Sequence, residues 1–338
     1  MKLLVFGGTA WLGRTLALEA LGRGHSVTCL ARGDSGDVLP GVRFVRADRS
    51  SSSSDVAYAQ VVGEHWDVVI DVATQPGHVR GAVAELHAVV GQYIFVSSGS
   101  VYASQRKLNQ DESAPIQEPL ESDVMESMAD YGRAKVACES AVTSVFGSER
   151  SLVARVGLIG GPGDTSGRSG YWPWRFSRPS NSSGTVLVPD APDLPAALID
   201  VRDLAEWLIT CAERGTVGVF NATANQLPFT DHLATARSVA GRRGDTVAAS
   251  SAWLVDQGVQ NWAGPRSLPL WLSDRDWFGL SAHDVSRARG AGLVSRPLEQ
   301  TLADTLEWEL DRAQPGPHGA GLTDEEERSL LAQLATAR

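Results

Sequence analysis

The first twenty residues constrain the fold more than any other stretch of this 338-residue chain. An apolar run from Leu3 to Phe6 predicts a buried strand, and Gly7 and Gly13 bracket a turn that leads into an alanine- and leucine-rich helix. A strand, a glycine turn and a helix in this order bring backbone N–H groups and the positive helix end together. The segment therefore predicts a phosphate-binding turn for a dinucleotide. Ala10 stands where that fingerprint has its middle glycine, so an ordinary strand–helix turn is the alternative.

Charge and cysteine content exclude several classes of protein. The formal net charge is −10, and the basic residues are scattered between acids, so we expect no nucleic-acid partner. The three cysteines lie far apart and form neither a disulfide framework nor a zinc spacing, so no metal is expected. No apolar run approaches the roughly eighteen residues of a membrane helix, and no signal segment precedes the first strand. We expect a cytoplasmic protein without a membrane partner.

Strand-like and helix-like segments alternate in the first half and predict an α/β fold, a Rossmann-type doubly wound parallel sheet. We expect residues 1–160 to form the dinucleotide-binding domain. Residues 161–338 are expected to form mainly a smaller C-terminal substrate-binding lobe, with about 199–225 returning to the core sheet. Residues 241–290 carry no periodic pattern and predict loops.

The end of the second strand, at 26–31, predicts which dinucleotide is bound. NAD enzymes usually carry an acid here to bind the ribose 2′-hydroxyl. This chain has Arg32, whose guanidinium suits a 2′-phosphate, so we predict NADP(H) rather than NAD(H). A surface role for Arg32 is the alternative. At the end of the third strand, Asp48 is expected to meet the adenine amino group or to cap a helix.

A strand end and a later helix predict catalytic groups. The apolar segment from Tyr93 runs into hydroxyl side chains, among them Ser98, at the edge where parallel sheets gather ligands. Tyr131 and Lys135 stand four apart, so they share one face of a helix. An ammonium near a phenol favours the phenolate, and the pair then relays a proton while a serine hydroxyl holds a substrate oxygen. The spacing alone is common by chance, but behind a phosphate-binding turn it becomes specific.

Five segments, in this order along about residues 1–230, resemble the extended short-chain dehydrogenase/reductase superfamily, most closely its NAD-dependent epimerase/dehydratase branch. The segments are Gly7–Gly13, Ser97–Tyr102, Tyr131–Lys135, Arg155–Pro162 and Ile199–Ala205. The resemblance implies that Tyr131 is the catalytic acid–base, that Lys135 binds the ribose and tunes the phenol, and that Ser98 binds the reacting oxygen. It also implies a monomer or homodimer, because helices around 80–90 and 131–146 often form a dimer face in this superfamily.

The predicted cofactor contacts follow from the turn, the strand ends and this resemblance together. They are Gly7, Thr9, Trp11, Leu12, Gly13, Arg32, Asp48, Arg49, Val72, Ala73, Tyr131 and Lys135.

Two departures from the branch affect the substrate. Sugar-nucleotide epimerases usually carry an Asn where this chain has Leu158, and leucine cannot donate to a phosphate. Dehydratases typically add an acid pair beside the catalytic hydroxyl, where this chain has Gly99 and Ser100. Both departures weigh against the functions of those relatives.

The substrate residues are expected in and after the glycine-rich stretch that follows Pro162. Tyr171, Trp172 and Trp174 either lie at the pocket mouth or attach the small lobe to the core. Arg168 is a candidate polar anchor, and Ser100 a further substrate contact. If the aromatic residues touch substrate, the substrate is partly apolar or aromatic.

Residues 111–130 hold seven acids and neither Lys nor Arg. This segment predicts a solvated loop; the alternative is a lid whose Met125 and Met128 touch substrate. An acidic rim of this kind disfavours an anionic substrate.

Three functions remain open. The first is an NADP(H)-dependent oxidoreductase that reduces a carbonyl or oxidises an alcohol on a small, partly apolar or aromatic molecule. The second is a sugar-nucleotide epimerase or dehydratase that retains its NAD(P) tightly. The third, a non-catalytic nucleotide-binding regulator, is disfavoured by Ser98, Tyr131 and Lys135 occurring together.

Overall fold

A computed structural model describes residues 1–50, 54–241 and 244–336. One seven-stranded sheet has the order β11-β6-β5-β4-β1-β2-β3, and all its neighbouring pairs are parallel. The order reverses between β1 and β4, and doubly wound sheets form their ligand crevice at such a point. The predicted Rossmann-type α/β fold is confirmed. The strands are β1 (Lys2–Phe6), β2 (Ser26–Ala31), β3 (Arg43–Arg46), β4 (Trp66–Asp71), β5 (Val90–Ser98), β6 (Ser151–Val156) and β11 (Gly218–Ala222).

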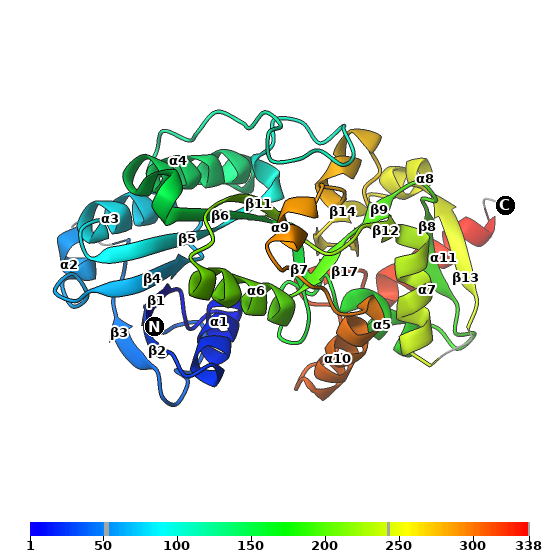
Figure 1. The fold of residues 1–338 in the computed structure, drawn as a ribbon. Coiled ribbons are helices and arrows are strands. Elements are labelled where there is room, and N and C mark those ends of the chain that lie inside the picture. Colours follow the sequence, from blue (N-terminus) through cyan, green and yellow to red (C-terminus); the bar gives the residue numbers. More distant parts are fainter. Residues whose placement is uncertain (51–53, 242–243, 337–338) are drawn as a thin grey trace.

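Helices cover both faces of this sheet (Figure 1). On one face lie α1 (Trp11–Gly22) and α6 (Val201–Arg214); on the other lie α2 (Ser54–Tyr58), α3 (Pro76–Leu86) and α4 (Tyr131–Arg150). Successive side chains of a strand point to opposite faces, so a strand covered twice must be apolar throughout. In β1, Leu3 and Val5 pack with the α1/α6 layer. Leu4 and Phe6 pack with the α3/α4 layer.

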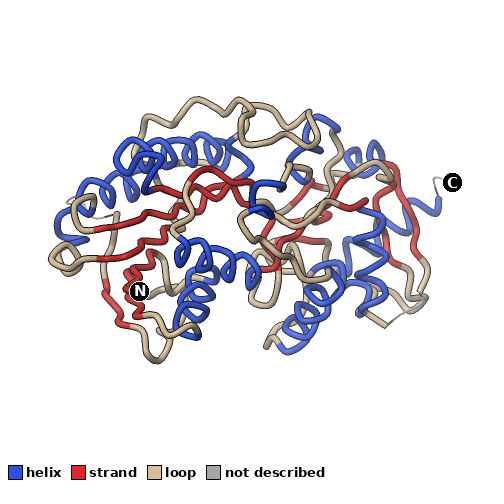
Figure 2. The backbone as a smooth tube through the Cα atoms, in the orientation of Figure 1, coloured by secondary structure: helices blue, strands red, loops and turns tan. Residues whose placement is uncertain are grey.

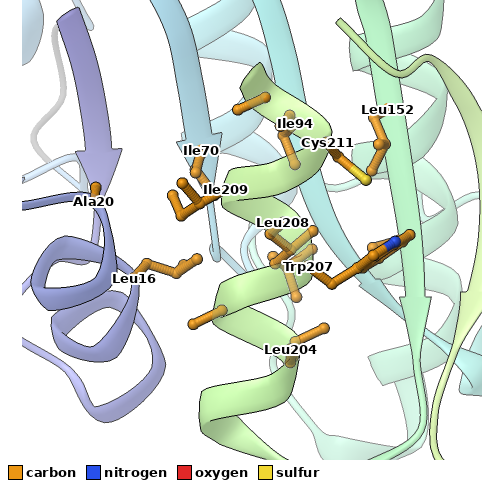
Figure 3. Packing of buried hydrophobic residues seen from close by; sticks show 14 of the residues in the cluster. Leu16, Ala20, Ile70, Ile94, Leu152, Leu204, Trp207, Leu208, Ile209 and Cys211 are labelled. Atoms are coloured by element: carbon orange, nitrogen blue, oxygen red, sulfur yellow. The ribbon is translucent and has the colours of Figure 1, made fainter. Parts of the chain in front are cut away.

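The α1/α6 layer shows how segments distant in sequence share one core (Figure 3). Leu16 of α1 and Ile209 of α6 lie over Ile70 of β4. Trp207 of α6 is buried against Phe220 of β11, with ring centroids 5.8 Å apart. Through α6 and β11, residues from the second half of the chain complete the first core.

The C-terminal lobe has a hydrophobic core of its own, at the right of Figure 2. Its helices are α5 (Tyr171–Ser177), α7 (Phe229–Val239), α8 (Ser251–Asp256), α10 (Leu298–Asp311) and α11 (Asp324–Thr336). Its paired strands are β8 (Val186–Asp190) with β13 (Thr246–Ser250), β9 (Pro195–Ala196) with β12 (Leu227–Pro228), β14 (Gln260–Trp262) with β16 (Ser267–Pro269), and β15 (Gly264–Pro265) with β17 (Ala320–Gly321). Residues 241–290, expected to be irregular and loop-rich, also hold several of these short elements, which the sequence did not predict.

Further short elements complete the fold. They are β7 (Leu158–Gly160) paired with β10 (Leu198–Asp200), α9 (Ser286–Gly290), and the 3₁₀ turns η1 (Gly99–Val101), η2 (Met128–Asp130) and η3 (Arg275–Ser281). Ala288 of α9 packs into the first core, so the late segment around it also returns to the sheet. No helix in the described part of the chain is long and apolar enough to cross a membrane.

Candidate active site

The glycine turn has the geometry that its glycines require. Gly7 has a φ of +76°, a conformation that other residues rarely adopt. A Cβ atom on Gly13 would lie 2.2 Å from the carbonyl oxygen of Gly7, so only glycine allows this approach of helix and strand. Ala10 has a φ of −80° and donates its N–H to Gly7 over 3.0 Å. The middle position therefore does not need glycine here, and the N-terminus of α1 has no side-chain cap.

A cleft of about 1120 Å³ runs from this turn to the C-terminal lobe. Trp11 and Leu12 line one end, the carboxyl ends of β4, β5 and β6 form its floor, and Trp262 and Trp277 line the other end. The indole N–H of Trp11 donates to the carbonyl oxygen of Pro162 over 2.8 Å. The turn and the loop after β7 are thus held together at the entrance to the cleft.

The structure brings Ser98, Tyr131 and Lys135 to this one cleft. Ser98 ends β5, and its hydroxyl oxygen accepts the Ser100 N–H over 3.1 Å. Tyr131 begins α4, and Lys135 follows one helical turn later. The Lys135 ammonium is buried and donates to the carbonyl oxygens of Ala73 and Val96, each over 2.7 Å. Lys135 is therefore fixed between the ends of β4 and β5, beside Tyr131.

A buried ion pair fixes α4 behind these residues. Glu139, one turn beyond Lys135, accepts hydrogen bonds from the Arg155 guanidinium of β6, with 2.9 Å between the closest atoms. Burial alone would lower the pKa of Arg155, but Glu139 raises it overall. Arg155 also lies over the Tyr102 ring, 5.0 Å from its centroid. Sequence analysis missed this pair, although Glu139 continues the helical spacing of Tyr131 and Lys135.

Arg49, predicted to contact the cofactor, lies in a different buried network. Its guanidinium forms two hydrogen bonds with the Asp71 carboxylate, of 2.9 and 2.7 Å, and others with Tyr58 and the His78 carbonyl. Tyr93 also donates to Asp71, over 2.7 Å. All three guanidinium nitrogens of Arg49 are engaged. Its observed role is to tie β4 to the segment after β3, and the predicted cofactor contact does not fit this arrangement.

Arg32 and Asp48 lie at the carboxyl ends of β2 and β3, as their predicted roles require, but not on the cleft lining. The Arg32 side chain is 60% exposed and 3.6 Å from the Asp34 carboxylate. The Asp48 carboxylate accepts the Ser50 N–H over 2.9 Å, and this hydrogen bond, aided by the charge of Arg32, lowers its pKa. Residues 51–53, which follow Asp48 and precede the first described residue of α2, lie outside the described part of the chain, so the alternative helix-capping role of Asp48 stays a prediction.

The remaining predicted cofactor residues surround the turn and the end of β4. Val72 lines the cleft, and a Cβ on Gly7 would lie 2.9 Å from its side chain. Ala73 supplies a carbonyl to Lys135. Thr9 is buried within the turn itself.

Of the predicted substrate residues, Ser100 and Arg168 line the cleft and the three aromatic residues do not. Tyr171, Trp172 and Trp174 are buried in α5. The Trp172 indole donates to the carbonyl oxygen of Pro269 over 2.8 Å, inside the second core. The prediction that these residues line the pocket mouth is corrected: they hold the lobe together, because α5 is buried on all sides.

Other aromatic residues take that place. Trp262 and Trp277 line the cleft, and Trp277 is 53% exposed. Trp262, which lines the cleft, has a φ of +68°. This backbone conformation is rare for a bulky residue, and such strained positions often occur at functional sites. Neither tryptophan is among the predicted site residues, because no periodic pattern in this part of the sequence indicates where their side chains lie.

The acidic loop reaches the cleft lining only through the uncharged residues Gln117, Met128 and Ala129. None of its seven acids at 111–130 is among the lining residues, whereas Met128 is and Met125 is not. Glu112 accepts the Asn221 N–H over 2.7 Å, and Asp123 pairs with Arg80. The expected acidic rim is therefore not built by this loop, although two acids from another segment, Asp274 and Asp276, line the cleft. Within the described residues, no three His, Cys, Asp or Glu side chains are arranged to hold a metal ion.

The chain has the fold of the extended short-chain dehydrogenases/reductases, in the form seen in the NAD-dependent epimerase/dehydratase branch. Several solved structures share this fold. UDP-N-acetylglucosamine 4-epimerase from Bacillus cereus matches with a TM-score of 0.64 and 15% identity, over 95% of this chain and 100% of that one. The Bordetella bronchiseptica enzyme WbmH, in complex with NAD+, matches with a TM-score of 0.62 and 15% identity, over 93% and 99% of the two chains.

A third match is UDP-glucose 4-epimerase from Bifidobacterium longum, in complex with NAD+ and UDP. Its TM-score is 0.63 and its identity 16%, over 92% of this chain and 99% of that one. No protein-family model matches the chain, and no curated protein does. At these identities the likeness establishes the fold alone.

Proposed function

We propose that this chain is a nicotinamide-dinucleotide-dependent enzyme that acts on a carbinol or carbonyl carbon and uses Tyr131 as its acid–base. One observation carries the proposal: Ser98, Tyr131 and Lys135 line a single cleft that begins at the glycine turn. A nicotinamide cofactor bound there would accept a hydride from the substrate carbon or return it.

The residues present fit such a cofactor. The uncapped N-terminus of α1 offers backbone N–H groups to a diphosphate, and the close packing at Gly13 leaves the turn free of side chains there. Val72 and Trp11 line the cleft beside the turn, and the Lys135 ammonium lies at its floor, where it suits ribose hydroxyls.

The protein side of the chemistry follows from the same geometry. The Ser98 hydroxyl donates to the reacting oxygen of the substrate and holds it near Tyr131. The Tyr131 phenol gives a proton to that oxygen or takes one from it. Lys135 keeps a positive charge beside the phenol, and its two backbone acceptors fix where that charge lies.

An epimerase-type cycle, in which the cofactor is retained and no net redox change occurs, is the favoured form. The support is that epimerases of this fold match more than nine-tenths of the chain, and that one of them and the enzyme WbmH are described with NAD+. Net NADP(H)-dependent oxidoreduction is the second candidate. It is favoured by Arg32 at the end of β2 and by Leu158, which lines the cleft where epimerases usually carry Asn.

Two measurements test these proposals. Mass spectrometry of the supernatant from heat-denatured protein should find about one equivalent of NAD(P) if the cofactor is retained. Incubation with UDP-glucose or UDP-N-acetylglucosamine should then form an epimer without a lasting absorbance change at 340 nm. Loss of all cofactor on dialysis, with NADPH consumed in turnover, would instead support the oxidoreductase.

Tyr131→Phe separates an enzyme from a non-catalytic binder. The variant should lose turnover by about 10²-fold or more, the usual size of an acid–base contribution, and should bind cofactor as the parent chain does. Full activity in this variant would contradict the proposed role of Tyr131 as the acid–base.

A further inference from the structure

Arg168 presents a guanidinium with unused donors at the wall of the cleft. It lies on the loop between β7 and α5 and lines the cleft together with Tyr131 and Ser98. Its Nε–H donates to the Ser166 hydroxyl over 3.0 Å. Its two terminal nitrogens have no hydrogen-bond or ion-pair partner among the residues that the structure describes. A planar fork of donors therefore faces the space where the substrate would lie.

The charge of Arg168 lacks a close counter-ion. Burial lowers the pKa of its guanidinium, and the charges of Asp164 and Tyr131 offset this only in part. Asp164 is 2% exposed, and its carboxylate already accepts four hydrogen bonds, from the N–H and hydroxyl groups of Ser166 and Ser169. Asp164 thus shapes the loop and leaves the terminal nitrogens of Arg168 free. Arg168 is partly buried, and a cation withdrawn from water without a partner is stabilised when a ligand supplies the opposite charge.

The surroundings hold the guanidinium in place. Gly167 has a φ of +71°, and a Cβ there would lie 1.9 Å from the carbonyl oxygen of His318, so this loop packs tightly on the segment after α10. The Arg168 guanidinium lies 5.9 Å from the centroid of the Trp262 ring. Because loop and ring are both fixed, little side-chain entropy is lost when the fork binds a ligand.

The other positively charged side chains that line the cleft, Lys135 and Arg106, already have hydrogen-bond or ion-pair partners. Lys135 donates to two backbone carbonyls. Arg106 pairs with Asp276 at the outer edge, and its side chain is 73% exposed. Arg168 therefore differs from both in being partly buried with free terminal donors.

We propose that Arg168 is an oxyanion anchor and that the substrate carries a carboxylate or phosphate group close to its reacting carbon. A guanidinium fork matches the paired oxygens of either group. Arg168 and Tyr131 line the same cleft, so an anion held by Arg168 would lie in the same space as the reacting oxygen. This inference deepens the proposed function and rests on it.

Binding to the NAD(H)-loaded full-length chain tests the proposal without turnover. The probes are D-glucose, D-glucuronate and D-glucose 6-phosphate, which differ only at C6, and their affinities are measured by isothermal titration calorimetry or ligand-detected NMR. We expect one of the two anions to bind about tenfold or more tightly than glucose, as charge-assisted bonds to Arg predict. The preferred anion tells a carboxylate site from a phosphate site.

Variants test whether Arg168 causes the preference for an anionic sugar over glucose. Arg168→Gln should abolish it, Arg168→Lys should retain part of it, and Arg106→Gln, the matched change at a paired arginine of the same cleft, should keep it. Far-UV circular dichroism checks that each variant is folded, and Arg168→Lys carries the test if Arg168→Gln is not.

Three results would overturn the proposal: no preference for either anion in the parent chain, a preference that survives Arg168→Gln, or weaker NAD(H) binding in that variant with sugar binding unchanged. The last result would assign Arg168 to the cofactor. Failure of the proposed function would appear separately, as undiminished turnover in Tyr131→Phe.

Discussion

The ammonium of Lys135 donates to the carbonyl oxygen of Val96 over 2.7 Å, at the point where β5 approaches the cleft. The side chain is thereby anchored to the sheet. We expect Lys135→Met to reduce turnover by about 10²-fold or more. The same change leaves two buried carbonyls without this donor, so the free energy of unfolding should fall by about 1–3 kcal/mol.

Urea unfolding and steady-state assays check both effects of Lys135→Met. Lys107→Met, at an exposed position outside the lining, is the control and should change neither quantity. An active, equally stable Lys135→Met protein would contradict the role of the ammonium.

Arg32 is expected to influence which dinucleotide binds. Its side chain is exposed at the end of β2 and only loosely paired with Asp34, so it is free to meet a 2′-phosphate. We predict that Arg32→Gln weakens NADPH binding relative to NADH by about tenfold, the size of a lost charge-assisted contact. Thermal shifts with each nucleotide measure the ratio. Arg43→Gln, at the first residue of β3 and so at the other edge of the sheet from Arg32, should leave the ratio of NADPH to NADH affinity unchanged. An unaltered ratio in Arg32→Gln would contradict the preference for NADP(H).

The buried pair of Glu139 and Arg155 should contribute strongly to stability. Removing one partner leaves an uncompensated buried charge, so Glu139→Ala is expected to cost about 3–5 kcal/mol in the free energy of unfolding. Asp193→Ala, which breaks an exposed pair with Arg275, should cost at most about 1 kcal/mol. The double change Glu139→Leu with Arg155→Met should recover much of the loss. Equal costs for the buried and exposed pairs in urea unfolding would contradict this account.

Asp71 should make stability sensitive to acid. Burial alone would raise the pKa of this carboxyl, but the ion pair with Arg49 and the hydrogen bonds from Arg49 and Tyr93 lower it overall. An unfolded Asp titrates near pH 4. The contribution is therefore complete above about pH 4 and is lost as pH falls further, through the lower pKa of the folded state.

Denaturant unfolding across pH 2 to 7 tests the role of Asp71. Asp71→Asn should be less stable at neutral pH, because Arg49 loses its partner, and should show a shallower decline in acid. Asp256→Asn, at an exposed position, should follow the parent curve. An unchanged slope in Asp71→Asn would contradict the pairing.

Local sequence patterns were enough to predict the sheet and the placing of Tyr131 and Lys135 on one helix that borders the cleft. The strand predicted at 26–31 agrees with β2, and Tyr131 and Lys135 lie one turn apart at the start of α4. These features depend on neighbours in sequence, because strand periodicity and helical spacing are local. Arg49 could not be placed in this way, since its partner Asp71 belongs to another strand and the charge of an arginine does not say which carboxylate it meets.

The end of the cleft at the C-terminal lobe was the least predictable part. An aromatic run such as that around Trp172 supplies apolar area equally well to a core or to a pocket, and only the packing of α5 decides between them. Trp262 and Trp277 reach the cleft through short irregular elements without periodicity, and the φ of +68° at Trp262 is set by the surrounding structure.

Trp11 belongs to the glycine turn, yet its indole is bonded to Pro162, and a Cβ on Gly163 would lie 2.8 Å from that ring. The glycine turn and the loop after β7 are therefore packed closely against each other, and a change in one requires a matching change in the other. Anyone who transplants the loop after β7 into another enzyme of this fold, to change its specificity, must move the residue at position 11 and the glycine at 163 as a pair. A transplant that carries only one of them would bring a mismatched surface to the cleft and disturb the glycine turn from outside.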